Sequence, residues 1–241
     1  SNTTGASNTA SGVSALYSNT TANQNTATGR NALYSNTTGA ENIASGYYAL
    51  YANTTGSWNT ANGNEALFTN TTGGWNTASG FKALNANTTG NYNTASGYQA
   101  LYTNTAHYNT AFGTSALYSN TTGARNTAIG KDTLVYNTTG NYNTGCGMYA
   151  LYYNTTGYTN TAVGYSALND VTTSIENTAV GESAGYQITT GSYNTQVGRH
   201  AGRYTTTGSF NVSLGTYASP ASGADVSSIT IGYAATGKGS N

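Results

Sequence analysis

The chain is short of charge, cysteine, proline and large aliphatic side chains. Only 6% of its 241 residues are charged, and seven Lys and Arg balance seven Asp and Glu, so the formal net charge is zero. An ordinary domain carries about 25% charged residues. Without a basic excess, the chain has no electrostatic basis for binding nucleic acid or an anionic membrane surface. We therefore expect neither nucleic acid nor membrane among its partners.

Other absences narrow the class further. The single cysteine, Cys146, excludes an internal disulfide framework. No apolar run approaches the ~18 residues of a membrane span, and the opening SNTTG is not a signal peptide. Low net charge also argues against ordinary disorder. Because the chain opens inside a repeat and stops at GKGSN, we expect it to be a fragment of a longer protein.

A repeat runs through the whole chain and is best followed from the Asn of the phrase NTA, here called the anchor. Every step between anchors is 17 residues except Asn93 to Asn109, which is 16, and one further step reaches Ser228. The anchors are Asn8, Asn25, Asn42, Asn59, Asn76, Asn93, Asn109, Asn126, Asn143, Asn160, Asn177, Asn194 and Asn211. This gives fourteen units and a single repeat domain over 1–241.

Several positions within the unit are nearly constant. Gly stands four residues after every anchor, and Ala stands seven after, replaced only by Thr133. Leu stands eight after in the first ten units, from Leu16 to Leu168. Asn stands eleven after in the first nine units, from Asn19 to Asn154. Repeated small and polar residues at fixed positions indicate stacking of equivalent residues.

The 17-residue period predicts an all-β fold, a β-solenoid of fourteen coils. Helical repeats are longer and do not tolerate this much Gly, and collagen needs Gly at every third residue. In a solenoid each residue stacks on its equivalent one coil away, at about 4.8 Å. The constant Gly then supplies a positive φ or a close backbone approach. In the 16-residue unit we expect an altered corner near Ala106 and His107, where the usual Gly is missing.

Stacking explains how so polar a chain can have an interior. Asn amides can hydrogen-bond along a column as in cross-β arrays, while Leu and Ala supply a thin apolar core. The alternative is N-glycosylation in a eukaryotic secreted setting, because ten Asn begin N-x-S/T triplets. These are Asn2, Asn19, Asn36, Asn53, Asn70, Asn87, Asn120, Asn137, Asn154 and Asn211.

The few charged residues agree with this register. Glu65 and Lys82 are 17 residues apart, and so are Glu182 and Arg199. Arg125 lies 17 residues before Tyr142. Opposite charges and Arg–aromatic pairs one coil apart are what a stacked array favours.

One strand position changes character along the chain. Three residues after the anchor, the first six units carry Ser, Thr or Asn, and later units carry Phe112, Ile129, Cys146 and then aliphatic residues. In the last two units the residue one after the anchor is also apolar, as in Ile229 and Ile231 of SSITIG. Either the core changes along the chain, or this face meets another chain near the C-terminal end.

The phrases SSITIGYAATGKGSN (227–241), NTAVGYSAL and NTAVGESAG resemble the head repeats of trimeric autotransporter adhesins. The longer phrase NTAxGxxALYxNTTG is similar to repeats of phage tail-fibre and related surface-fibre proteins that carry an endosialidase-type intramolecular chaperone. The resemblance covers the whole chain as a repeat and implies a left-handed β-roll-like solenoid that assembles as a homotrimer. The unit here is about three residues longer than the adhesin unit, and the chain lacks a chaperone domain.

We find no catalytic, metal-binding or cofactor-binding motif in the sequence. His107 and His200 stand at different repeat positions, and so do the carboxylates Asp170, Glu176 and Glu182. There is no metal-spaced Cys/His cluster and no phosphate-binding Gly loop with Lys. We therefore expect a protein that is not an enzyme and that uses no cofactor.

Aromatic residues are the best binding candidates, and they recur at two positions of the unit. Flat rings with polar edges suit the faces of sugar rings, whereas the alternative is self-stacking that shields the backbone. Directly before the anchor stand Trp58, Trp75, Tyr92, Tyr108, Tyr142, Tyr193 and Phe210. Nine residues after the anchor stand Tyr17, Tyr34, Tyr51, Phe68, Tyr102, Tyr118, Tyr152 and Tyr186.

The sequence thus predicts a structural fibre shaft of a phage tail fibre or a cell-surface adhesin, extracellular or virion-associated. Its expected partners are copies of itself, as a homotrimer or a filament, and surface polysaccharide. Two alternatives stay open. One is a glycan-coated extracellular filament, and the other is an ice-binding β-solenoid that uses the TAS and TAT triplets of the early units.

Overall fold

The computed structural model describes residues 2–237 and divides into two compact units, Ser1–Thr122 and Gly123–Asn241. Each unit is a β-solenoid in which every repeat contributes one three-residue strand followed by turns, so the predicted fold class is confirmed. The described residues contain no helix, and so none that is long and apolar enough to cross a membrane. The expected single domain over 1–241 and the predicted trimer stay predictions.

Each strand begins one residue after an anchor position, and all the strands are short. The first unit contains β1 (Thr9–Ser11), β2 (Thr26–Thr28), β3 (Ile43–Ser45), β4 (Thr60–Asn62), β5 (Thr77–Ser79), β6 (Thr94–Ser96) and β7 (Thr110–Phe112). The second contains β8 (Thr127–Ile129), β9 (Thr144–Cys146), β10 (Thr161–Val163), β11 (Thr178–Val180), β12 (Thr195–Val197), β13 (Val212–Leu214) and β14 (Ile229–Ile231).

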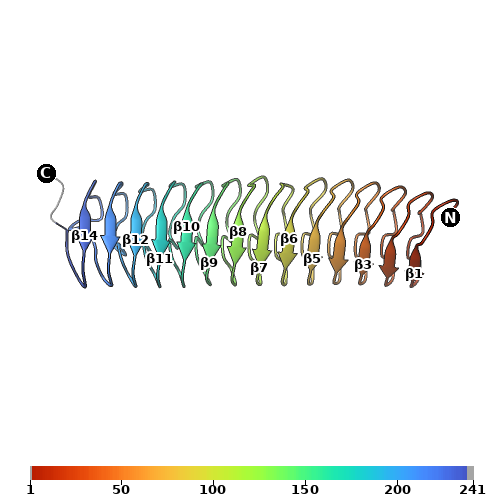
Figure 1. Cartoon of the computed structure of the whole chain (residues 1–241), viewed down its shortest axis with the longest axis horizontal. Coiled ribbons are helices and arrows are strands. Elements are labelled where there is room, and N and C mark those ends of the chain that lie inside the picture. Colours follow the sequence, from red (N-terminus) through yellow and green to blue (C-terminus); the bar gives the residue numbers. More distant parts are fainter. Residues whose placement is uncertain (1, 238–241) are drawn as a thin grey trace. The chain divides into compact units, whose positions relative to one another are not determined.

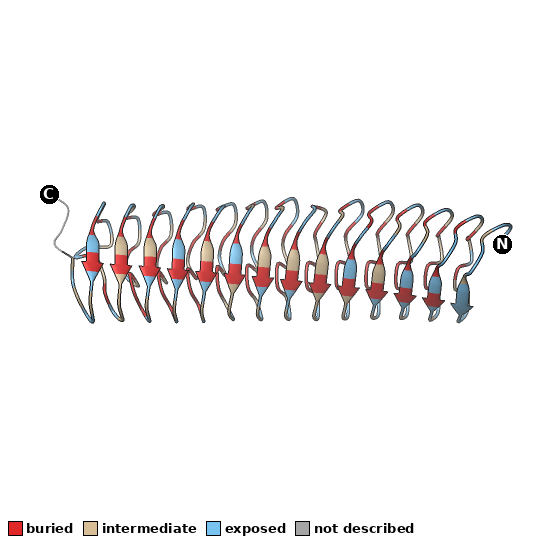
Figure 2. Ribbon diagram, viewed as in Figure 1, coloured by how far each residue is buried: buried red, intermediate tan, exposed pale blue. Residues whose placement is uncertain are grey.

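Within each unit, consecutive strands lie side by side in chain order (Figure 1) and pair in parallel. The register matches equivalent residues, as in Thr60↔Thr77 and Ala61↔Ala78. From β2 onward the middle residue of each strand is buried and its two neighbours are more exposed, as the banding in Figure 2 shows. The alternation follows from the two-residue side-chain period of a strand.

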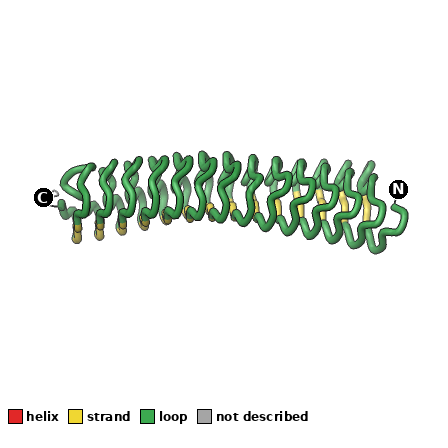
Figure 3. The backbone as a smooth tube through the Cα atoms, turned by 90° about the horizontal axis from the view of Figure 1, so that it is seen from above, coloured by secondary structure: helices red, strands yellow, loops and turns green. Residues whose placement is uncertain are grey.

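Most of each coil is turn rather than strand (Figure 3), and its backbone still hydrogen-bonds to neighbouring coils. The amide of Leu50 donates to the carbonyl of Ala66 in the following coil, at 3.0 Å. The amide of Tyr48 donates in the opposite direction, to Arg30 in the preceding coil, also at 3.0 Å. The turns therefore add to the same inter-coil hydrogen bonding as the strands.

These turns use left-handed backbone at residues that are not glycine. The Leu eight after the anchor has φ near +50°, for example +51° at Leu50 and +50° at Leu84. The residues six after and one before the anchor are also left-handed, as at Tyr48 (+56°) and Trp58 (+58°). Such a conformation costs about 1–2 kcal/mol for an L-residue. It turns the amides of two residues that are two positions apart toward opposite neighbouring coils, and these hydrogen bonds offset the cost.

The constant Gly four after the anchor is required for two reasons. Its φ lies in the positive region, for example +142° at Gly63. A Cβ placed on Gly63 would also lie 2.5 Å from the carbonyl oxygen of Gly80 in the next coil. The predicted roles of this glycine, positive φ and close backbone approach, are both confirmed.

The apolar interior consists of one Leu column with two Ala columns beside it. Leu50, Leu67, Leu84 and Leu101 are completely buried, as are Ala residues at the middle of the strands and next to each Leu. The predicted inward Leu column is therefore confirmed. Ala leaves room for the close coils, while Leu supplies most of the buried apolar volume.

Two buried Asn columns complete the interior, as the stacking argument predicts. The anchor Asn42 donates its backbone amide to Oδ1 of Asn25 at 2.9 Å and its side-chain amide to the carbonyl of Gly56 at 2.8 Å. The Asn eleven after the anchor form the second column, in which Asn53 Nδ2 donates to Asn36 Oδ1 at 2.8 Å and to Gly56 O at 2.9 Å. One carbonyl thus accepts from both columns.

The repeat deviates in two places. In the 16-residue repeat, Ala106 takes the place of the usual Gly, and its carbonyl accepts from Asn93 and Asn104. None of the described residues donates to Oδ1 of Asn87. The altered corner that the sequence predicts is therefore confirmed. The second Asn column ends at Asn154. In the next two coils the equivalent position is occupied by the buried apolar residues Val171 and Ile188.

The interior near the end of the second unit becomes polar. Gly185 and Gly202 replace Leu, and a Cβ on Gly202 would overlap the side chain of Gln196. Gln196 is completely buried, and none of the described residues pairs with its amide nitrogen or oxygen. Toward the end of the second unit, the outward strand positions therefore become apolar while the interior of the same coils becomes polar.

Candidate binding site

The residues directly before the anchors form an exposed first aromatic column. In the first unit, Trp58 and Trp75 stack with ring centroids 4.6 Å apart, and Tyr92 and Tyr108 continue the stack at 5.1 Å per step. Trp75 is 48% exposed. In the second unit, Tyr193 stacks on Phe210 at 4.8 Å. Self-stacking and outward display therefore occur together, which leaves ring edges and terminal ring faces open to a ligand.

The residues nine after the anchors form a second aromatic column, which is more covered. Tyr17, Tyr34, Tyr51 and Phe68 stack at 5.0, 5.2 and 5.3 Å. Of these residues Tyr17 is exposed, and the other three are half-buried. Tyr102 and Tyr118 form a further pair at 5.1 Å. The step of about 5 Å between rings equals the coil spacing, because each ring sits on its equivalent.

The charged residues lie in the predicted register. Lys82 Nζ is 3.4 Å from Glu65 Oε2, and Arg199 Nε is 3.1 Å from Glu182 Oε2. In the first aromatic column, Arg125 Nη1 donates to the Tyr142 hydroxyl at 2.7 Å. These pairs confirm the one-coil spacing, and their exposure to solvent makes each a weak contribution to stability.

The N-x-S/T asparagines are mostly interior. Asn19, Asn36, Asn53, Asn70, Asn87, Asn120, Asn137, Asn154 and Asn211 are all buried, whereas Asn2 is exposed. A glycan on a buried column member such as Asn53 would break the hydrogen bonds to both neighbouring coils. The geometry therefore favours the buried-ladder interpretation at these nine positions.

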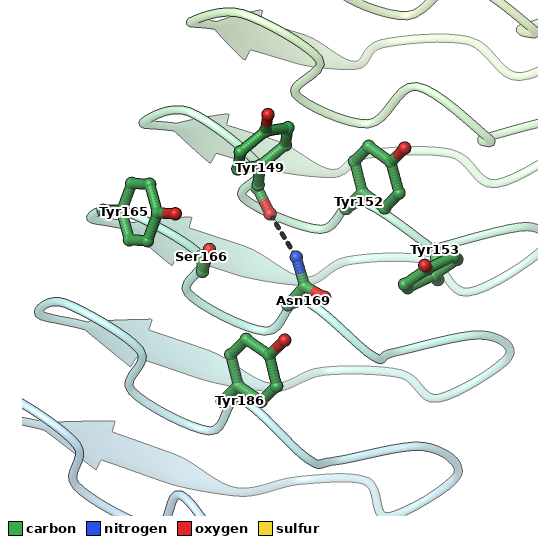
Figure 4. Close-up of a pocket in the computed structure, with 7 residues that line it drawn as sticks. All are labelled: Tyr149, Tyr152, Tyr153, Tyr165, Ser166, Asn169 and Tyr186. Atoms are coloured by element: carbon green, nitrogen blue, oxygen red, sulfur yellow. Dashed lines mark hydrogen bonds between the residues drawn. The ribbon is translucent and has the colours of Figure 1, made fainter.

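An open cleft of about 330 Å³ lies in the second unit, and we name it the tyrosine cleft. Figure 4 shows Asn169 in the middle of a ring of tyrosines. The residues that line the cleft are Tyr149, Tyr152, Tyr153, Tyr165, Ser166, Asn169 and Tyr186. Its volume is at the low end of the ~300–1,000 Å³ typical of ligand sites.

Three successive coils build the tyrosine cleft. The coil of β9 supplies Tyr149, Tyr152 and Tyr153, the coil of β10 supplies Tyr165, Ser166 and Asn169, and the coil of β11 supplies Tyr186. Asn169 occupies the position nine after its anchor, where the flanking coils carry Tyr152 and Tyr186. The cleft is therefore a gap in the second aromatic column, one coil high.

The walls of the cleft are held by ring–ring and amide contacts. Tyr149 meets Tyr152 edge-on at 5.4 Å and Tyr165 at 6.0 Å. Tyr152 meets Tyr153 edge-on at 4.7 Å. Asn169 Nδ2 donates to the backbone carbonyl of Tyr149 at 3.1 Å, which fixes the amide at the floor. Edge-on pairs of this kind are each worth about 0.5–1.5 kcal/mol, so the walls are preorganised.

Burial and neighbouring groups raise the pKa of three ionisable residues in or next to the cleft. A hydrogen bond to the Tyr136 side chain, followed by burial, raises the pKa of Tyr152 to about 12. Burial and then the charge of Asp170 raise the pKa of Tyr186, and burial raises the pKa of Asp170. At neutral pH the hydroxyls of Tyr152 and Tyr186 therefore keep their protons and can donate hydrogen bonds as well as accept them.

Sequence reasoning found only part of this cleft. Tyr152 and Tyr186 were expected as column members, but Tyr149, Tyr153 and Tyr165 stand at other repeat positions and were missed. The signal was present, because aromatics at three different positions of adjacent coils surround Asn169, which takes the place of an aromatic residue in the second column.

The residues considered for catalysis do not converge on one site. Glu182 contacts Arg199, and its Oε1 is 3.9 Å from His200 Nε2, whereas His107 accepts a hydrogen bond from the backbone of Asn91 in the first unit. Among residues 2–237, no three His, Cys, Asp or Glu side chains are grouped so that they could hold a metal ion. The expectation that the chain is not an enzyme stays a prediction.

Comparison with protein-family models, with curated proteins and with solved structures found no match. The resemblance of the repeats to adhesin heads and surface fibres therefore stays an interpretation of the sequence.

Proposed function

We propose that the chain is a shaft segment of an extracellular or virion-associated fibre that projects from a surface and contacts glycans through its aromatic columns. The observation that carries this proposal is the in-register repetition of outward rings on coils that carry almost no charge, such as Trp58, Trp75 and Tyr92. A repeated ring presents the same weak contact many times, and linked weak contacts give avidity.

Two measurements test this proposal. Small-angle scattering of the purified chain should give the profile of an elongated particle with a constant cross-section. A glycan array probed with the intact chain should show binding to polysaccharides of repeated sugars and weak binding to monosaccharides. A compact particle would contradict the shaft role, and an array without any signal would remove the glycan contact while leaving the shaft.

The working form of this shaft is an oligomer of copies of the chain, with three copies as our proposal. The outward positions of β14 are apolar, with Ile229 70% exposed and Ile231 67% exposed. Val163, Val180 and Val197 are exposed on β10 to β12, at the strand position that Ile231 occupies on β14. Such a continuous apolar face is costly in water at about 25 cal/mol per Å². Light scattering should give a multiple of 24.7 kDa, and a stable monomer would contradict the oligomer.

Ice binding is a second candidate, and it is favoured by the outward threonines of the first unit. Thr60, Thr77 and Thr94 pair in register on β4 to β6, which gives a row of methyl and hydroxyl groups at the coil spacing. Ile43 interrupts the row on β3, and Phe112 replaces the neighbouring Ser on β7. Thermal hysteresis of the intact chain tests this candidate, and its absence would exclude it.

A further inference from the structure

We propose that the tyrosine cleft binds one neutral sugar ring between Tyr152 and Tyr186, in the place left free where Asn169 interrupts the second aromatic column. This rests on the proposed glycan contact, which it deepens by assigning a site. The cleft is distinct from the first aromatic column, so the two ideas can fail independently.

The height of the gap fits a single ring. Consecutive rings of the second aromatic column stand 5.1 Å apart at Tyr102 and Tyr118. Tyr152 and Tyr186 belong to coils two steps apart, so their rings are about 10 Å apart at the usual coil spacing. A six-membered sugar ring inserted at this level would contact one tyrosine side chain on each side. Asn169 is the shorter side chain that keeps this level open.

The polar groups around the gap suit sugar hydroxyls. Asn169 uses Nδ2 to donate to the Tyr149 carbonyl, and no described residue donates to its Oδ1, which therefore can accept from a ligand. In Figure 4 the hydroxyls of Tyr165 and Tyr186 point toward Asn169. Ser166 adds a further small hydroxyl to the lining. Aromatic walls with a few fixed polar groups at their edge are the usual composition of a ligand site.

Electrostatics favours a neutral sugar over an acidic one. The residues that line the cleft include no Asp, Glu, Lys, Arg or His. The nearest carboxylate in sequence is Asp170, whose charge acts on Tyr186 and would repel a uronic or sialic acid. Arg203 lies over the Tyr186 ring at 5.6 Å, and it comes from the coil that follows Tyr186 rather than from the coils of the gap.

The second aromatic column is interrupted at a second place, Asn85, which provides a control site within the same chain. Asn85 stands between Phe68 and Tyr102 in sequence register and donates to the carbonyl of Glu65 at 3.0 Å, as Asn169 does to Tyr149. There, however, the positions equivalent to Tyr149 and Ser166 carry the ion pair of Glu65 and Lys82. Asn85→Ala therefore removes the same type of hydrogen bond without touching the tyrosine cleft.

Saturation-transfer NMR on the full chain tests the proposal, with maltohexaose and cellohexaose as neutral probes and polygalacturonate as the acidic probe. We expect transfer to at least one neutral probe and none to polygalacturonate. Tyr165→Ala should weaken neutral binding about tenfold. Tyr98→Ala, at the same repeat position and equally exposed, should leave it unchanged.

Asn169→Tyr gives the decisive variant because it fills the gap with a residue that the column accepts in neighbouring coils. We expect it to fold and to lose neutral-sugar binding, while Asn85→Ala keeps it. Binding that survives Asn169→Tyr, or that Tyr98→Ala weakens as strongly as Tyr165→Ala, would overturn the proposal. If only Trp75→Ala abolishes polysaccharide binding, the glycan contact stands and the cleft assignment falls.

Discussion

The side-chain amide of Asn36 donates to Oδ1 of Asn19 at 3.0 Å and to the carbonyl of Gly39 at 2.9 Å. The first bond joins two coils and the second closes a turn within one coil. One buried amide thus stabilises the local turn and its stacking together. This coupling explains why the chain repeats Asn at a position where a globular protein would place an aliphatic residue.

Removing one member of this column should strongly destabilise the first unit. Asn53→Ala removes the bonds to Asn36 and Gly56 and leaves Asn70 without its inter-coil acceptor. Each buried group left unpaired costs about 1–3 kcal/mol, so we expect a loss of about 2–5 kcal/mol in the free energy of unfolding. Urea denaturation measures it. The exposed neighbour Thr55→Ala should change stability by less than about 0.5 kcal/mol, and equal effects would contradict a structural ladder.

Gly63 and Gly232 allow two reasons for the constant Gly to be tested separately, its positive φ and its close approach to the backbone of the next coil. Gly63 and Gly232 both have positive φ, +142° and +121°. A Cβ on Gly63 meets Gly80 O at 2.5 Å, whereas on Gly232 the nearest described atom is Ala235 Cβ at 3.8 Å. We expect Gly63→Ala to lower the melting temperature clearly more than Gly232→Ala. Similar losses would mean that φ alone requires the glycine.

Exposed and buried large side chains should behave differently. Leu67→Ala opens a cavity in the interior and should cost about 2–5 kcal/mol. Trp75→Ala removes an outward ring and should cost about 0.5–1.5 kcal/mol, since only stacking is lost. In a polysaccharide adsorption assay on folded protein, Trp75→Ala should bind less and Leu67→Ala should bind normally. A reversed pattern would contradict the binding role of the first aromatic column.

Asp170 should make stability depend on pH with an unusual sign for a carboxylate. Burial raises its pKa above the usual value of 3.8, so the folded chain holds this proton more tightly than the unfolded chain. Its contribution is therefore complete below the unfolded pKa and is lost as pH rises through the folded pKa.

The variant Asp170→Asn should accordingly be more stable than the parent at pH 7 and lose this advantage near pH 3, as followed by thermal melting. Asp132→Asn is the control, because Asp132 is already paired with Lys131 at 3.7 Å and should gain nothing at pH 7. An Asp170→Asn chain that is less stable than the parent at pH 7 would refute the assignment.

The apolar outer face of β14 should mark the contact between copies. Ile229→Asp places a charge on this face, and Ile43→Asp places one at the same strand position on β3. We expect Ile229→Asp to lower the mass measured by light scattering and Ile43→Asp to leave it unchanged. If both variants keep the parent mass, the contact lies elsewhere.

The fold was largely readable from the sequence because stacking repeats its signal. The 17-residue period, the constant Gly and pairs such as Glu65 and Lys82 each predicted register, and the structure confirms them. The left-handed backbone of the Leu column was not predicted. Positive φ is expected at Gly or Asn, and nothing in a Leu residue announces it. Its cause is the inter-coil hydrogen bonding, which only the assembled coil provides.

The tyrosine cleft was predicted less well, for a related reason. A column is visible as recurrence at one position, and Tyr152 and Tyr186 were found in that way. The cleft depends instead on an interruption, Asn169, and on aromatics at three other positions. A single departure from the repeat carries little weight in sequence, although in space it opens a complete level of the stack.

Each coil contacts its neighbours through the same set of hydrogen bonds and side-chain contacts. One 17-residue segment can therefore be inserted or removed inside a unit without a change in how the remaining coils pack. Excision of the segment from Asn59 to Trp75, for example, would place the anchor Asn76 next to Asn42. The backbone amide of Asn76 could then donate to Oδ1 of Asn42, as the amide of Asn59 does now. Unequal recombination within the coding sequence could therefore change the number of coils in steps of one. The number of coils in such a solenoid would be inherited as a count of repeats, and selection could act on it independently of the residues on the surface.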